Sequence, residues 1–281
     1  ARGIVLDSYI NDKDTYQYLH AMYSFANEKG VTMNESTCGW TKAQRETLAA
    51  YEGIWDCYML QDAALENAAT AKEAVDFMGA KITEQGWNGW PECIVVADGT
   101  DVWVFEAYGG HMWCAFKLPD DAFFFCANRC RIDFWEEDSD TYLSAPNMKE
   151  FALETGLWNG EGEFRPNDVF CPNAVENMGC TLREWRAITL LNPELYGDLD
   201  PWGDPDDYPL FVKPDHLLTV DDIHRFCSDY YAGTQFDLSR TADAGDFGNV
   251  LSNYHNSLKK ATREGVARPI NMFRATYVQI S

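Results

Sequence analysis

The sequence predicts an α+β fold built on an antiparallel β-sheet. Four short apolar segments follow one another within residues 93–127, and turn-forming residues separate each from the next. Helix start signals stand before and after this block of strands. Connections this short can join only antiparallel strands, because parallel strands need a long crossover. The order of elements therefore favours strands and helices in separate groups over alternating β-α units.

The predicted strands are apolar runs bounded by turn residues, with one further strand ahead of the first helix. They cover residues 31–33, 93–97, 102–107, 111–118 and 122–127. The turns between the last four are Asp98-Gly99, Gly109-Gly110 and Pro119-Asp120-Asp121. We expect the strands on either side of Gly109-Gly110 to pair antiparallel. Trp103 and Phe105 share one strand face and should point into a layer that packs against the sheet.

Four helices are predicted from capping residues followed by apolar residues at helical spacing. Their start signals lie at Thr70, Ser144, Thr181 and Thr219, and their end signals at Gly86, Gly156, Pro193 and Gly233. Thr70 with Glu73, and Thr181 with Glu184, have the spacing of a capping box, in which two orphan backbone donors are satisfied reciprocally. The acidic residues of 133–140 and the Asp-, Pro- and Gly-rich residues of 196–209 predict exposed loops.

Charge and composition exclude several classes of function. The net charge of −23 disfavours binding to nucleic acid or to an anionic membrane surface. No apolar run reaches the length of a membrane span. The spacing of the nine cysteines does not form a zinc set, so no metal is expected. Strong acidity and abundant cysteine favour a secreted or lysosomal location over the cytoplasm. The sequence does not decide whether the protein forms a homo-oligomer.

Three local patterns suggest other chemistry, and each has a simpler interpretation. Asp198 and Asp200 resemble the start of a calcium loop, but the residue at its twelfth position is proline, so a solvated acidic loop fits better. Cys38 and His111 are a candidate nucleophile and base without a local signature, and a strand histidine between aromatics is more often structural. The many aromatic residues would suit a carbohydrate-binding surface, although most fall at periodic core positions.

Five segments, in the same order, resemble the dipeptidases of peptidase family C69. They are "NEKGVTMNEST" (27–37), "TAKEAVDFMG" (70–79), "VWVFEAYGGHMWCAFKLPDDAFFFCANRCRI" (102–132), "DYPLFVKPDHLLTVDDIHRFCSDYYAGTQFD" (207–237) and "RPINMFRATYVQ" (268–279). No single motif is decisive, but five in register over nearly the whole chain make a chance match improbable. The resemblance implies an αββα sandwich of the N-terminal nucleophile hydrolase type, in which two antiparallel sheets lie between helix layers.

The resemblance also implies a cysteine-type dipeptidase that acts on short peptides with a free amino terminus. A cysteine that begins the mature chain attacks the peptide carbonyl, its own α-amino group serves as the base, and no metal or organic cofactor is needed. Ala1 has no nucleophile, so the nucleophilic cysteine is expected outside this chain. We interpret residues 1–281 as one C69-like hydrolase domain, incomplete at both ends. The alternative is a catalytically silent relative, or an aromatic-rich binding or structural protein in an assembly.

Site residues are carried over only where motifs match. Asn128, at the end of the fourth predicted strand, would donate its side-chain amide to the oxyanion, since an amide donates without being charged. Glu35 and Thr37 lie where the family places pocket residues, and a carboxylate there would hold the substrate's ammonium group. Arg129 and Arg274 are candidate anchors for a substrate carboxylate. The expected partner is a small peptide.

Overall fold

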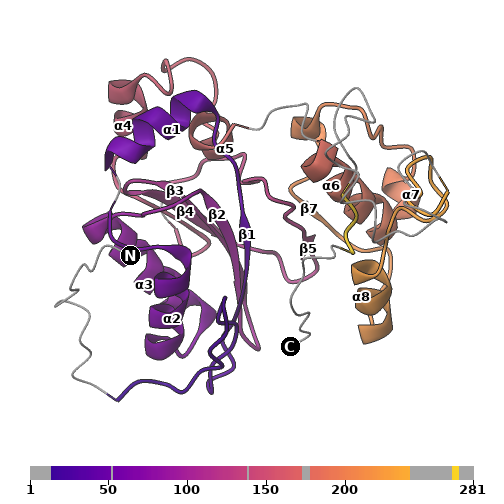
Figure 1. Cartoon of the computed structure of the whole chain (residues 1–281), viewed down its shortest axis with the longest axis horizontal. Helices are drawn as coiled ribbons and strands as arrows, with labels where there is room; N and C mark the ends of the chain where they lie inside the picture. Colours follow the sequence, from indigo (N-terminus) through magenta and orange to yellow (C-terminus); the bar gives the residue numbers. More distant parts are fainter. Residues whose placement is uncertain (1–13, 52, 138, 173–177, 241–267, 272–281) are drawn as a thin grey trace.

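A computed structural model describes residues 14–51, 53–137, 139–172, 178–240 and 268–271. Within them the predicted α+β fold is confirmed: helices accompany two antiparallel sheets, of five and two strands. Figure 1 shows the larger sheet with β1–β4 beside α2 and α3, and β5 and β7 beside α6 and α8. No helix in the described ranges is both long and apolar enough to cross a bilayer.

The five-stranded sheet has the order β1-β2-β3-β4-β6, and every neighbouring pair is antiparallel. Its strands are β1 (Thr32–Thr37), β2 (Glu92–Ala97), β3 (Val102–Gly109), β4 (Met112–Lys117) and β6 (Tyr142–Ser144). The predicted hairpin through Gly109-Gly110 is confirmed, because Gly109 pairs with Met112 and Trp103 with Lys117. Gly110 takes a φ of 53°, a left-handed conformation that glycine adopts without strain.

The fourth predicted strand, over residues 122–127, is largely wrong. Only β5 (Phe123–Phe124) is a strand, and it pairs with β7 (Phe211–Val212) in the smaller sheet. Its place beside β4 is taken by β6, which lies between the predicted acidic loop of 133–140 and the predicted helix and includes the start signal Ser144. The rings of Phe123 and Phe125 pack against Phe226 of α8, so this segment belongs to the smaller sheet and does not hydrogen-bond with β4. Alternation of apolar residues predicts a strand but not its partner.

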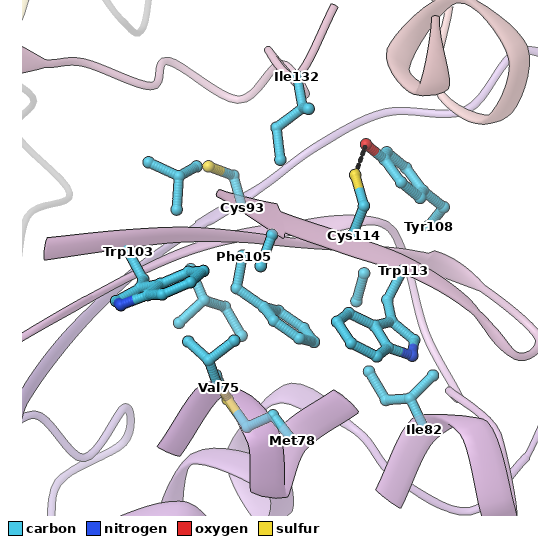
Figure 2. Close-up of a cluster of buried hydrophobic side chains, with 14 of the residues drawn as sticks. Val75, Met78, Ile82, Cys93, Trp103, Phe105, Tyr108, Trp113, Cys114 and Ile132 are labelled. Atoms are coloured by element: carbon cyan, nitrogen blue, oxygen red, sulfur yellow. Dashed lines mark hydrogen bonds between the residues drawn. The ribbon is translucent and has the colours of Figure 1, made fainter. Parts of the chain in front are cut away.

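The helix-facing side of the large sheet packs against α2 (Cys57–Asn67) and α3 (Ala71–Gln85). Trp103 and Phe105 point into this layer, as predicted, and Figure 2 shows them with Trp113 above Val75, Met78 and Ile82 of α3. All six side chains are at most 6% exposed. The ring of Phe105 stacks on Trp113, with the centroids 5.3 Å apart. Burial of these large apolar side chains stabilises the sheet-helix layer.

The opposite side of the sheet carries Cys93, Cys114 and Tyr108, as Figure 2 shows. The ring of Tyr108 stacks on Phe170 of α5 (Pro166–Phe170), with the centroids 5.5 Å apart. The helices α1 (Lys42–Leu48) and α4 (Met148–Thr155) lie on the same side as α5, away from α2 and α3 (Figure 1).

A second hydrophobic cluster gathers around the smaller sheet. It includes residues of α6 (Met178–Leu191), of α8 (Val220–Cys227) and of the segment that follows α8. Tyr196 of α7 (Pro193–Tyr196) packs against this cluster. The two short 3₁₀ helices are η2 (Ala49–Tyr51) and η3 (Pro205–Asp207).

The structure confirms two of the four predicted helix starts and corrects the other two. Thr70 caps α3 by accepting from the Glu73 backbone, and the predicted helix is confirmed. Thr219 forms a complete capping box with Asp222 at the start of α8. The capping box at Thr181 is wrong, because α6 begins at Met178 and Thr181 is buried inside it. The remaining helix, α4, begins after Asn147, whose side chain makes no capping hydrogen bond, because Ser144 belongs to β6.

Candidate functional site

Asn128 lies against the end of β1 and is held on three sides. Its backbone N–H donates to Ser36 Oγ over 2.9 Å, and its side-chain Nδ2 donates to the Thr37 carbonyl oxygen over 2.7 Å. Its Oδ1 accepts from Arg183 Nη2 over 2.7 Å. A φ of 62° places Asn128 in the left-handed region, which asparagine tolerates better than most residues. The Thr37 carbonyl oxygen uses one of the two amide N–H groups of Asn128, and within the described residues the second makes no hydrogen bond.

Arg183 orients the Asn128 amide, and sequence reasoning missed it. The guanidinium is 6% exposed and also donates to the carbonyl oxygens of Gly179, over 2.7 Å, and Ala127, over 3.3 Å. Because Arg183 binds Oδ1 and the Thr37 carbonyl binds Nδ2, the amide plane of Asn128 is fixed and its two ends cannot exchange. The signal for Arg183 would have been a charged residue inside a helix. The predicted capping box at Thr181 instead places Arg183 in the first turn.

The alternation of side chains along β1 separates the predicted pocket residues from Asn128. Glu35 is opposite Ile94, and Thr37 opposite Glu92, so these side chains share the face that packs on α2 and α3. Ser36 points to the other face, where it binds the Asn128 backbone. The side chains of Glu35 and Thr37, predicted as pocket residues, therefore face away from the Asn128 side chain. Ser36 is the β1 side chain that contacts Asn128. The alternation of side chains along a strand could have indicated that Ser36 faces the opposite side from Glu35 and Thr37.

Arg129 is buried among acceptors of the protein itself. Its guanidinium is 3% exposed and donates to Glu184, with Nε 3.0 Å from Oε2, to Asp206 over 3.2 Å, and to the Pro205 carbonyl oxygen over 3.0 Å. A substrate carboxylate would have to displace one of these partners, so the geometry gives no support to the predicted anchor. Arg274 lies outside the described residues.

The segment that follows Asn128 is attached to β3 by the buried carboxyl group of Glu106. This side chain is 0% exposed and accepts from the backbone N–H groups of Arg131 and Ile132 and from the Tyr108 hydroxyl, the last over 2.8 Å. Burial raises the pKa of Glu106 to about 8. Glu106 thereby fixes the course of the chain just after Asn128. Its position within a predicted strand does not reveal this role.

We expect the raised pKa of Glu106 to make folding stability depend on pH. Between its ordinary value of 4.5 and about 8, the folded chain binds a proton that the unfolded chain releases. The stability that Glu106 contributes is thus complete below pH 4.5 and is lost as pH rises towards 8, by up to about 1.4 kcal/mol per pH unit. Urea unfolding from pH 5 to 8.5 should therefore show a flatter profile for Glu106→Gln than for the wild type. The exposed Glu161→Gln variant serves as control, and equal slopes for Glu106→Gln and the wild type would contradict the assignment.

A carboxyl pair, Glu35 and Glu92, lies on the helix-facing side of the sheet. Glu92 is 5% exposed, and its Oε2 is buried without a hydrogen-bond partner. Thr37 Oγ1 lies 3.5 Å from Glu35 Oε2. Burial raises the pKa of both groups, and the neighbouring Glu35 charge raises that of Glu92 further. The sequence did not reveal this pair because Glu92 directly precedes the predicted strand of residues 93–97, so the sheet face that its side chain occupies could not be assigned.

All nine cysteines lie within the described residues and are free thiols. Five of them form what we call the thiol cluster, on the face of the sheet opposite α2 and α3: Cys38, Cys93, Cys126, Cys130 and Cys171. They lie close enough together to shift one another's pKa values. Burial raises the pKa of Cys38 well above its usual range, so this thiol is a poor nucleophile.

The alternative pairing of Cys38 with His111 is not formed. His111 lies in the turn between β3 and β4, with Nδ1 3.0 Å from the carbonyl oxygens of both Ile82 and Thr83 at the end of α3. Its neighbours are thus on the helix-facing side, whereas Cys38 belongs to the thiol cluster on the other side.

The fold is of the predicted α+β class with antiparallel sheets, and comparison with known proteins gives the family. A family profile described as peptidase family C69 matches residues 10–280. The chain therefore belongs to peptidase family C69.

Similar proteins carry consistent names. A protein named dipeptidase from Bifidobacterium longum is 30% identical over 185 residues, which cover 60% of this chain and 34% of that protein. A probable dipeptidase from Latilactobacillus sakei is 28% identical, covering 75% of this chain and 44% of its own length. One from Salmonella dublin is 26% identical, covering 81% and 53%. The chain thus spans about a third to a half of the length of these relatives.

Proposed function

We propose that this chain is part of a cysteine-type dipeptidase that hydrolyses short peptides with a free amino terminus through an acyl-enzyme. The observation that carries the proposal is the match of residues 10–280 to peptidase family C69, together with relatives named dipeptidase. The nucleophilic cysteine would be supplied by sequence outside this chain. The proposed reaction uses no cofactor.

The proposed fold of the complete enzyme is the αββα sandwich of N-terminal nucleophile hydrolases. Three features support it. The five-stranded sheet is antiparallel, and α2 and α3 form a helix layer on one of its faces (Figure 1). The smaller sheet approaches the other face, since the ring of Phe116 on β4 contacts Phe124 of β5 and Phe211 of β7, with centroids 6.4 Å apart in both pairs.

Asn128 is the residue of this chain that we place in the reaction. Its second amide N–H would donate to the oxygen that becomes negative when the thiolate attacks the peptide carbonyl. Thr37, through its carbonyl oxygen, and Arg183 hold the amide in one orientation, so no reorganisation is needed as the charge develops. The proposal includes no role for the side chains of Glu35 and Thr37, which face the helix layer.

The proposed function is tested with the full-length protein, including its N-terminal segment, and a panel of dipeptides. Release of free amino acids, with loss of activity after alkylation of the N-terminal cysteine, would support it. A full-length chain that begins without cysteine and hydrolyses no dipeptide would favour the catalytically silent or binding relative.

We expect Cys38→Ala to leave dipeptide turnover largely intact in that full-length enzyme. The Cys38 thiol is 4% exposed, its pKa is raised by burial, and it has no α-amino group to act as base. The measurement is kcat for a good dipeptide substrate, with circular dichroism as the control for folding. A loss of about a thousandfold, with the fold preserved, would restore Cys38 as nucleophile and contradict the N-terminal mechanism.

A further inference from the structure

The carboxyl pair of Glu35 and Glu92 has a third neighbour, Cys57, at the start of α2. One ligand atom from each residue, two carboxylate oxygens and the Cys57 Sγ, lies within 4.8 Å of the other two. The three residues come from three elements, β1, β2 and α2, and two of them, Glu92 and Cys57, are each 5% exposed. Sequence spacing could not reveal this group, because its members are 22 to 57 residues apart.

The arrangement lacks a positive partner. In the part of the chain that the structure describes, neither Glu35 nor Glu92 makes an ion pair with lysine, arginine or histidine. One Glu92 oxygen, Oε2, has no hydrogen-bond partner at all, although its residue is almost fully buried. Burying two carboxyl groups side by side is costly unless something neutralises them, and buried charges in proteins are usually paired or bound to metal.

We propose that Glu35, Glu92 and Cys57 form a binding site for one borderline divalent cation of the zinc type. Carboxylate oxygen and thiolate sulfur are both good ligands of Zn²⁺, whereas Mg²⁺ and Ca²⁺ avoid sulfur. Tetrahedral coordination at the usual bond lengths would bring the three ligand atoms to roughly 3.3–3.8 Å from one another. Because the present separations are at most 4.8 Å, the ligand atoms would have to approach one another by no more than about 1.5 Å, which side-chain rotation can supply. The cation would use the unpartnered Glu92 Oε2 and join β1, β2 and α2.

The proposed site is separate from the proposed catalytic residue. Glu35 points to the helix-facing side of β1, whereas Asn128 is bound to Ser36 on the other side. The cation would therefore act structurally, by connecting the sheet to the helix layer, and the proposed dipeptidase chemistry does not depend on it.

The test is equilibrium dialysis of the reduced full-length protein against Zn²⁺, with metal measured by mass spectrometry. We expect one tightly bound Zn²⁺ in the wild type. Glu92→Gln and Cys57→Ser should each weaken binding by more than the roughly 10- to 100-fold that loss of a mere outer-shell partner costs. Co²⁺ should give a thiolate-to-metal absorption band in the wild type that is absent from Cys57→Ser.

Because the thiol cluster could also bind soft metals, Cys130→Ser is the matched control. It removes a cluster thiol and leaves the carboxyl pair untouched, so it should keep the tight Zn²⁺. Thermal unfolding provides a second readout: Zn²⁺ should raise the Tm of the wild type and of Cys130→Ser, but not that of Glu92→Gln. Glu92→Gln is nearly isosteric and removes a repulsive charge, so the variant should fold.

Two results would overturn the proposal. If Cys130→Ser loses the bound Zn²⁺ and Glu92→Gln keeps it, the metal belongs to the thiol cluster. If the wild type binds no Zn²⁺ above the level of Glu92→Gln, the two carboxyl groups share a proton and no cation. Either result leaves the proposed dipeptidase function standing, since neither measurement involves turnover.

Discussion

Replacing Asn128 by alanine in the full-length enzyme is expected to lower kcat for dipeptides by about 100- to 1,000-fold and to leave KM nearly unchanged. The physical reason is that an oxyanion donor acts mainly in the transition state, where charge develops on the carbonyl oxygen. Steady-state kinetics with a good dipeptide substrate measures both parameters.

Three further variants separate donation from positioning. Asn128→Asp keeps an acceptor for Arg183 but has no donor when ionised, so it should be at least as slow as alanine. Asn128→Gly removes the amide and relieves the left-handed φ of 62°, so it should also be slow but well folded. Asn147, which has the same φ and no side-chain capping bond, is the matched control: Asn147→Ala should turn over dipeptides normally.

Normal turnover in Asn128→Ala would contradict the oxyanion role. Normal turnover in Asn128→Asp alone would show that the residue acts as the acceptor of Arg183 and not as a donor. Equal loss in Asn128→Ala and Asn147→Ala would mean that backbone strain, not the amide, causes the effect.

Replacing Glu184 by alanine is expected to lower the free energy of unfolding by about 3–5 kcal/mol. The carboxylate is 0% exposed and lies 3.0 Å from the Arg129 guanidinium and 3.5 Å from that of Arg131. Both arginines are 3% exposed, so the variant leaves Arg131 without its buried counter-charge and Arg129 with only the partly exposed Asp206. Alanine is a good helix former, so α6 itself is not weakened. Urea unfolding at one pH measures the change.

A surface ion pair provides the control for Glu184. Glu163 lies 3.7 Å from Arg165 and its side chain is 85% exposed, so Glu163→Ala should cost about 1 kcal/mol or less. Glu184→Gln keeps the side-chain shape and should fall between wild type and Glu184→Ala. If Glu184→Ala costs no more than Glu163→Ala, the buried network does not contribute as the geometry indicates.

The helices and hairpins were predictable because their signals are local. Thr70 and Glu73 before α3, Thr219 and Asp222 before α8, and Gly109-Gly110 between β3 and β4 all act within a few residues of the chain. Where a local signal competed with packing, it failed. Thr181 and Glu184 have the spacing of a cap, but Glu184 is used inside the fold by two arginines, and the helix starts earlier.

The candidate site was predictable only in part, for a related reason. Motif resemblance pointed to Asn128 and to the end of β1, which the structure brings into contact. The resemblance also assigned Glu35 and Thr37 to the substrate pocket. Their side chains face the helix layer, whereas Ser36 faces Asn128, because neighbouring residues of a strand point to opposite faces.

The antiparallel α+β class, the strands β2–β4, the helices α3, α4, α6 and α8, and the resemblance to peptidase family C69 all followed from the sequence. Only the tertiary structure decided which strand pairs with β4, which face each site residue occupies, and that Arg183 orients Asn128. It also brought Glu35, Cys57 and Glu92 together from separate elements. The reason is physical: capping and turn formation involve neighbours in the chain, whereas strand pairing and buried charge pairing join residues tens of positions apart, and their geometry is set by the packing of the whole core.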